Sequence, residues 1–121
     1  MIEVKHLCKT FGSQLVLDDI SCHFEAGNIH GIVGNNGSGK TVLMKCICGF
    51  LQPDSGSVVV AGKRLGRDVD FPDSTGIIIE TPGFLPSYTG LGNLKLLAEL
   101  NRKISEQEIR AAMTRVGLNP D

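Results

Sequence analysis

The chain has 121 residues, of which 41% are apolar and 21% charged, and its formal net charge is −1 at pH 7. This length is enough for one domain with a real core. The near-neutral charge gives no electrostatic case for nucleic acid, so we expect no nucleic-acid partner. The sequence has no apolar run of about 18 residues that would span a bilayer, and its first residues lack the apolar core of a signal peptide. We therefore expect a cytoplasmic protein.

Cysteine and histidine usage gives little sign of a metal or redox site. The three histidines show no recognisable ligand spacing. No two cysteines form a CxxC pair, and we interpret all four as reduced thiols that pack as small apolar side chains: Cys8, Cys22, Cys46 and Cys48. A metal or redox role is the less favoured alternative.

The first two predicted elements are strands. Residues 2–7 and 15–24 are rich in apolar and β-branched side chains. In the second segment, apolar side chains alternate toward one face, as a half-buried strand requires: Ile20, Cys22 and Phe24.

A third strand and a helix follow around a glycine-rich segment. Residues 29–33 are a short apolar run, as in a buried parallel strand. Residues 40–48 predict a helix that ends at Gly49, because apolar side chains recur there at helical spacing: Val42, Leu43, Cys46, Ile47 and Phe50.

The middle of the chain predicts two more strands with loops between them. Residues 57–61 and 76–79 are β-branched runs, and the second is the most apolar segment. Residues 65–74 form a polar connection, and residues 81–92 a loop rich in proline and glycine.

Two helices are predicted at the C-terminal end. They cover residues 93–101 and 105–116. Ser105 followed three residues later by Glu108 is a capping box, in which each residue satisfies a backbone N–H of the other.

Residues 34–41 read GNNGSGKT and match the pattern G-x-x-x-x-G-K-[ST] in full. The glycines let successive backbone N–H groups turn inward, and the loop opens a helix whose N-terminus favours anions. Lys40 adds a charge that reaches the outer phosphates, and the Thr41 hydroxyl can bind Mg²⁺. A strand before the loop and a helix after it are both predicted, which disfavours a chance glycine-rich turn. We therefore predict a site for ATP and Mg²⁺.

The surrounding segments resemble the ATP-binding subunits of ABC transporters over essentially the whole chain. LQPDSGSV at residues 51–58 resembles the stretch that follows the phosphate-loop helix in that family, and KTFG at residues 9–12 resembles its adenine loop. GIIIE at residues 76–80 lies where the family has the strand into its Q-loop. The segment at residues 79–86, ETPGFLP preceded by isoleucine, is similar to the bacitracin- and lantibiotic-type export subgroup.

Two positions depart from the family pattern. Glu80 stands where most members have glutamine, and residues 92–94 read GNL where the family has ENL. The family's signature loop, second acidic motif and switch histidine have no counterpart in these 121 residues. On that resemblance we expect an N-terminal fragment that binds nucleotide but lacks ATPase activity alone.

The nucleotide-binding residues expected from the loop and the resemblance are Phe11, Val16, Asn35, Asn36, Gly37, Ser38, Gly39, Lys40, Thr41 and Val42. Phe11 would stack on adenine, with core packing as the alternative, and Val16 is as readily a core residue. Glu80 is the candidate catalytic residue and, with Thr41, a candidate Mg²⁺ ligand, because a carboxylate binds Mg²⁺ strongly. A structural role in its loop is the alternative for Glu80.

The resemblance implies an α/β fold with a P-loop NTPase core, an antiparallel β layer and the start of a helical subdomain. Residues 1–90 would form the core and β layer, and residues 91–121 the start of the helical subdomain. The family's core sheet takes further strands from the second half, so residues 29–33 and 77–79 would present unpaired edges and favour self-association.

The implied function is ATP binding and hydrolysis coupled to export of a peptide antibiotic or similar substrate. The implied partners are a membrane-spanning permease subunit and a second ATP-binding subunit, at the cytoplasmic face of the cell membrane. The alternatives are a nucleotide-binding fragment without turnover and a non-transport ABC protein.

Overall fold

The computed structural model describes residues 1–35, 37–79, 83–99 and 104–121. The chain divides into two compact units, Met1–Glu80 and Thr81–Asp121. The expected division into residues 1–90 and 91–121 as core and helical subdomain stays a prediction. No helix within the described ranges has the length and apolar character needed to cross a bilayer.

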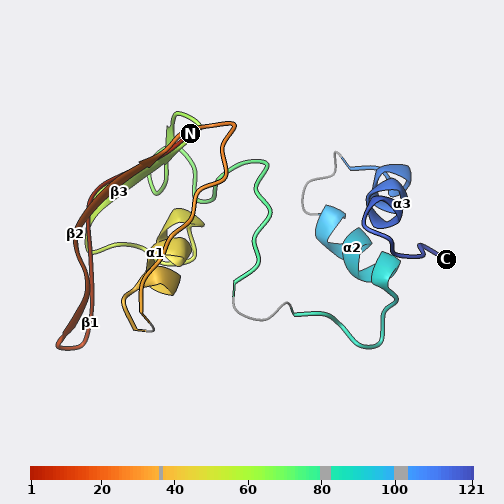
Figure 1. Cartoon of the computed structure of the whole chain (residues 1–121), viewed down its shortest axis with the longest axis horizontal. Helices are drawn as coiled ribbons and strands as arrows, with labels where there is room; N and C mark the ends of the chain where they lie inside the picture. The colour runs from red at the N-terminus through yellow and green to blue at the C-terminus, as the bar shows by residue number, and fades with distance from the viewer. Residues whose placement is uncertain (36, 80–82, 100–103) are drawn as a thin grey trace. The chain divides into compact units, whose positions relative to one another are not determined.

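The first unit is built on an antiparallel sheet with the strand order β2-β1-β3-β4. Its strands are β1 (Ile2–Phe11), β2 (Gln14–Phe24), β3 (Ser55–Val60) and β4 (Lys63–Arg64). Figure 1 shows β1, β2 and β3 side by side as one curved layer, with β1 and β2 meeting in a hairpin. Gly12 turns that hairpin with φ of 60°, a conformation that suits glycine.

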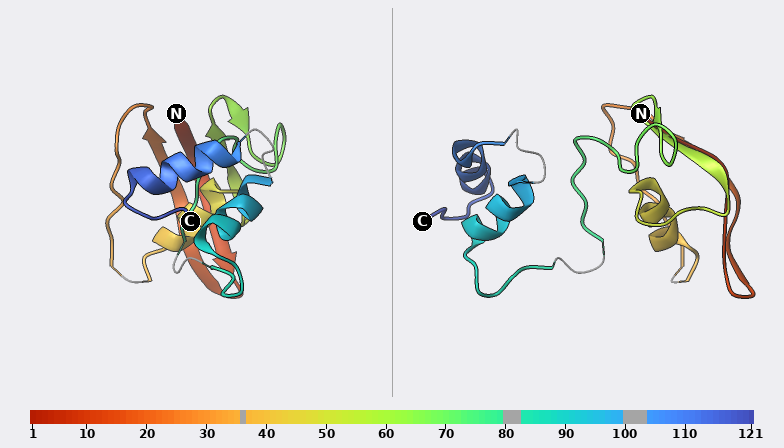
Figure 2. Two further views of the ribbon diagram at one scale, coloured as in Figure 1. Left: turned by 90° about the vertical axis from the view of Figure 1, so that its right-hand side faces the viewer. Right: turned by 180° about the vertical axis from the view of Figure 1, so that it is seen from behind.

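Helix α1 (Lys40–Ile47) lies against one face of this sheet (Figures 1 and 2). Its predicted bounds are confirmed to within one residue, and Gly49 follows its end with φ of 83°. The predicted apolar face is also confirmed, except that Phe50 is exposed. The core joins that face to the sheet through Val4, Leu7, Leu17, Leu43, Cys46, Ile47 and Val58.

Strand β1 is longer than the sequence predicts because a bulge interrupts its alternation. His6 and Asp19 face each other across β1 and β2 with φ of 49° and 51°, and their side chains lie 2.7 Å apart, Nδ1 to Oδ1. The register with β2 shifts between Val4 and Leu7, so both side chains are buried although they are three residues apart. The strict period of two therefore breaks after Val4, whereas the strand continues past its predicted end at Leu7 to Phe11.

Two predicted strands, residues 29–33 and 76–79, do not form. Both segments lack strand structure, and no described strand pairs with either. Ile29 is 103% exposed, Val33 94% and Ile78 77%. An extended apolar segment becomes a strand only when a neighbour supplies the backbone hydrogen bonds. Among the described residues these segments have no such neighbour, so the prediction of strands there was wrong.

The second unit is a pair of helices, α2 (Gly90–Glu99) and α3 (Glu106–Arg115), which contact each other. Helix α2 begins three residues before the predicted Asn93, because the Thr89 hydroxyl accepts a hydrogen bond from the Gly92 N–H at 3.0 Å. The predicted end at residue 101 lies outside the described residues. The capping box of α3 is confirmed: the Ser105 hydroxyl accepts from the Glu108 N–H at 3.1 Å, and the Glu108 carboxylate accepts from the Ser105 N–H.

Candidate functional site

The segment before α1 folds into a tight loop that depends on glycine. A Cβ atom on Gly34 would lie 2.6 Å from Ser38 Oγ, so the two ends of the loop approach closely. The Ser38 N–H donates to the Asn35 carbonyl at 3.1 Å. Gly37 and Gly39 have φ of 84° and 95°, in the left-handed region that other residues rarely adopt. The described residues of this segment therefore make a tight turn that leads into α1.

The N-terminus of α1 has no side-chain cap. Its N-cap residue is Gly39, whose missing side chain cannot accept a hydrogen bond from the first turn. The first helical bond runs from the Leu43 N–H to the Gly39 carbonyl at 2.9 Å. The N–H groups before Leu43 have no partner inside the helix, and the helix dipole adds partial positive charge. This end of α1 is therefore suited to an anion.

Lys40 reaches back across the loop. Its ammonium group donates a hydrogen bond to the Gly34 carbonyl, at the other end of the loop. The Lys40 side chain therefore holds its positive charge over the loop, next to the uncapped end of α1. Thr41 follows on the first turn and is exposed.

A cavity of about 310 Å³ lies at this end of α1. It is lined by Gln14, Val16, Gly37, Gly39, Lys40, Thr41 and Val42. Of the two residues expected here from the β1–β2 hairpin, Phe11 and Val16, the structure brings Val16 to the cavity. Gln14 lines the same cavity and was missed by the sequence analysis. Its position between Phe11 and Val16, two residues expected at the site, could have indicated it.

A third register shift in the hairpin places Val16 there. The β1–β2 register passes from Lys9 opposite Leu17 to Thr10 opposite Leu15, so Val16 is an extra residue in β2. A Cβ atom on Gly39 would lie 3.1 Å from the Val16 carbonyl oxygen. Glycine at position 39 therefore suits both this close approach and the left-handed φ of 95°.

Phe11 lies at the end of β1 and does not line the cavity. It pairs with Gln14 across the hairpin, so the two side chains share one face of the sheet. The ring is 44% exposed, and the Lys9 ammonium lies 5.3 Å from its centroid. The structure therefore places Phe11 on the same face of the hairpin as Gln14, but not in the lining of the cavity.

Two candidate residues, Asn36 and Glu80, lie outside the described residues. Asn35 and Ser38 are exposed on the loop. The described ranges contain no group of three or more His, Cys, Asp or Glu side chains that could hold a metal by themselves. One hydroxyl ligand still fits Mg²⁺, because this ion usually keeps several waters and takes further oxygens from a bound phosphate.

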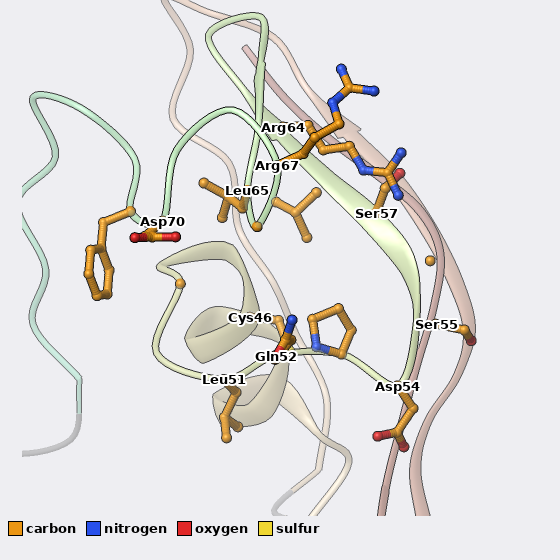
Figure 3. A pocket seen from close by; sticks show the side chains of 16 residues that line it. Cys46, Leu51, Gln52, Asp54, Ser55, Ser57, Arg64, Leu65, Arg67 and Asp70 are labelled. Atoms are coloured by element: carbon orange, nitrogen blue, oxygen red, sulfur yellow. The ribbon is translucent and has the colours of Figure 1, made fainter.

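A larger cavity of about 550 Å³ lies at the opposite end of α1, among α1, β3 and the segment after β4 (Figure 3). The labelled side chains in Figure 3 are of mixed character, from Leu51 and Leu65 to Arg64 and Arg67. No phosphate-binding backbone lines this cavity. Size alone would favour it, but the glycine loop and the uncapped helix end assign the phosphate chemistry to the smaller one.

A glycine loop, a helix N-terminus and a lysine arranged in this way define a P-loop nucleotide-binding protein. The sequence family described as ABC transporter matches residues 17–121. The chain belongs to the ABC transporter family.

Curated relatives are similar over nearly the whole chain. It is 43% identical to the uncharacterized ABC transporter ATP-binding protein YybJ of Bacillus subtilis strain 168, covering 98% of this chain and 54% of the relative. It is 35% identical to the bacitracin transport ATP-binding protein BcrA of Enterococcus faecalis, covering 100% of this chain and 40% of the relative. It is 31% identical to the Fe(3+) ions import ATP-binding protein FbpC of Yersinia pestis, covering 98% of this chain and 35% of the relative. The chain thus spans about half the length of these relatives, or less.

Solved structures agree on the fold. An ATP-binding subunit of an ABC transporter matches with a TM-score of 0.73 and 30% identity, covering 88% of this chain and 45% of that one. A dimeric bacterial ABC transporter cassette matches with a TM-score of 0.77 and 22% identity, covering 95% of this chain and 55% of that one. The expected fold class, an α/β P-loop NTPase core with an antiparallel β layer, is confirmed, although its parallel strands do not form in the described part of the chain.

Proposed function

We propose that this chain binds Mg-ATP as part of the ATP-binding subunit of an ABC transporter. The observation that carries the proposal is the uncapped N-terminus of α1, which faces a cavity lined by Gly37, Gly39 and Lys40. This arrangement leaves backbone donors and one cation directed at the same small space.

The backbone N–H groups of the loop, Lys40 and Thr41 would each have a different part in such a site. The N–H groups of Gly37 and of residues 39–42 would hold phosphate oxygens, because helix N-termini and left-handed glycines present donors to anions. Lys40 would exchange its hydrogen bond to the Gly34 carbonyl for one to the outer phosphates. The Thr41 hydroxyl would bind Mg²⁺, which neutralises phosphate charge.

The proposal extends to transport by the whole protein. ATP hydrolysis would drive export of a peptide antibiotic or similar substrate, with a membrane-spanning permease and a second ATP-binding subunit as partners at the cytoplasmic face of the membrane. The support is the segment at residues 79–86, the 35% identity to a bacitracin transport protein, and a similar cassette whose structure is dimeric. A ferric-iron import protein is 31% identical, so the choice of export rests on that segment.

The binding proposal is tested by calorimetric titration of Mg-ATP into the protein and two variants. Lys40→Ala should abolish measurable binding, because hydrogen bonds to charged groups contribute about 1.5–3 kcal/mol each. Lys63→Ala is the matched control, since Lys63 is an exposed lysine in the same unit and its ammonium lies 3.5 Å from Asp73. Equal affinity of the wild type and Lys40→Ala would show that the loop is not the binding site.

A further inference from the structure

Asp54, just before β3, makes three separate contacts with the end of β1. Its carboxylate accepts a hydrogen bond from the Thr10 N–H at 2.7 Å, and its own N–H donates to the Cys8 carbonyl at 2.9 Å. The other carboxylate oxygen lies 3.4 Å from the Lys9 ammonium. Figure 3 shows Asp54 at the start of β3, at the opposite end of the strand from Arg64 and Arg67.

The Lys9 side chain is held in place by this carboxylate. It is only 17% exposed, so protein atoms enclose most of it. A lysine this enclosed loses most of its conformational freedom, so the contact with Asp54 fixes where the ammonium lies. That position is 5.3 Å from the centroid of the Phe11 ring.

The ammonium contacts the ring through its π electrons. A cation over one face of an aromatic ring draws electron density toward itself. The opposite face then becomes a better partner for an electron-rich purine, since stacking depends on complementary charge distributions. Phe11 keeps 44% of its surface exposed, and it shares a face of the hairpin with Gln14, which lines the phosphate-site cavity.

We propose that Asp54 is a positioning residue for nucleotide recognition. Through Lys9 and the Thr10 N–H it fixes the Phe11 ring as a stacking surface for a purine base beside the phosphate loop. Asp54 itself does not touch the nucleotide. This inference rests on the proposed function, because it requires that the phosphates of the same molecule bind at Lys40.

The test compares ATP with inorganic tripolyphosphate, which carries the same phosphate groups but no base. Both are titrated with Mg²⁺ into the wild type, Asp54→Ala and Lys9→Met. The wild type should prefer ATP by about 5- to 150-fold, the range expected for one stacked base. Both variants should lose most of this preference while their affinity for tripolyphosphate stays unchanged.

Two further variants sharpen the comparison. Asp54→Asn keeps an oxygen that can accept from the Thr10 N–H, so it should retain more of the ATP preference than Asp54→Ala. Lys5→Met is the matched control for Lys9→Met, because Lys5 is an exposed lysine of the same strand and pairs with Glu3. It should keep the full preference. If Asp54→Ala fails to fold, Lys9→Met, which leaves the contacts of Asp54 with Cys8 and Thr10 in place, decides the question.

Any of four results would overturn the inference. An equal loss of ATP and tripolyphosphate affinity in the variants would show that Asp54 only supports the fold. A variant preference equal to that of the wild type would show that the ring does not need Asp54. Equal binding of ATP and tripolyphosphate by the wild type would leave the phosphate site standing but remove the base-stacking surface. Binding of neither ligand by the wild type would reject the proposed function as well.

Discussion

Gly56 and Gly12 both have left-handed backbones, with φ of 88° and 60°, but their surroundings differ. A Cβ atom on Gly56 would lie 2.3 Å from the His6 carbonyl oxygen and 2.6 Å from that of Lys5. The same atom on Gly12 would meet nothing within 4 Å. The backbone of β1 at His6 therefore lies directly against Gly56, at the bulge that lets both Val4 and Leu7 enter the core.

Gly56→Ala should destabilise the protein more than Gly12→Ala. A left-handed alanine costs about 1–2 kcal/mol at either position, and the clash at Gly56 should add about 1–3 kcal/mol as overpacking does in cores. Urea unfolding followed by circular dichroism measures the free energy of unfolding of both variants. Equal losses of the free energy of unfolding would mean that β1 yields freely at its bulge.

The buried cysteines should resist alkylation. Cys46 is 2% exposed and Cys48 6%, and burial raises the pKa of both thiols above the ordinary value of 9.0. A raised pKa leaves less of the reactive thiolate at any pH below it. At pH 8 iodoacetamide should therefore modify both residues slowly in the native protein and rapidly in urea, as mass spectrometry of the peptides would report. Rapid labelling without urea would contradict the packing of α1 on the sheet.

Glu80 is the other residue expected to contribute to the Mg²⁺ site. If it contributes to the Mg²⁺ site, Glu80→Gln should raise the Mg²⁺ concentration needed for half-maximal ATP binding, because a neutral amide binds Mg²⁺ less strongly than a carboxylate. Thr41→Ala is the matched comparison, since the Thr41 hydroxyl is the other expected ligand. An unchanged Mg²⁺ requirement in Glu80→Gln would assign Glu80 a structural role in its loop.

At the scale of elements, local patterns predicted most of the structure. The helical spacing after Gly39 predicted α1, and Ser105 with Glu108 predicted the start of α3, because the helix periodicity and its caps are written in adjacent residues. The glycine-dependent turn just before α1 was equally predictable. These features need only a few neighbouring residues to form.

The features that the sequence did not predict correctly depend on contacts between residues far apart in the chain. The continuation of β1 beyond Leu7 requires the bulge opposite Asp19, and the contact of Val16 with Gly39 requires an extra residue in β2. Strand structure at residues 29–33 and 76–79 would require neighbouring strands that the described residues do not supply. A pattern of apolar residues predicts burial but not the partner that provides it.

The cap of α3 gives a test at this scale. Ser105→Ala should cost about 1 kcal/mol, because the Glu108 N–H would lose its acceptor. Hydrogen exchange of the amides in the first turn should become faster, with little change in α1. Ser13→Ala, in the exposed turn of the hairpin, is the control. Unchanged exchange in α3 would show that the capping box contributes nothing to its stability.

At the scale of the whole molecule, the exposed apolar segments should promote self-association. Ile29, Val33 and Ile78 are all at least 77% exposed, and unpaired extended segments can recruit the same segments of other copies. Light scattering should report a dimer or larger species. Ile78→Lys should reduce this self-association. Thr75→Lys, which adds the same charge nearby at an exposed polar residue, should not. A monodisperse wild-type monomer that binds no hydrophobic dye would contradict this expectation.

Nucleotide binding at the N-terminal end of α1 is the property on which the proposed function depends. Titration of Mg-ATP into ¹⁵N-labelled protein, followed by backbone amide resonances, tests it most directly. The largest shifts should belong to the residues that line the cavity of about 310 Å³, which are Gln14, Val16, Gly37, Gly39, Lys40, Thr41 and Val42. Shifts centred instead on Leu51, Arg64 and Arg67, around the cavity of about 550 Å³, would contradict it, as would no shifts at all.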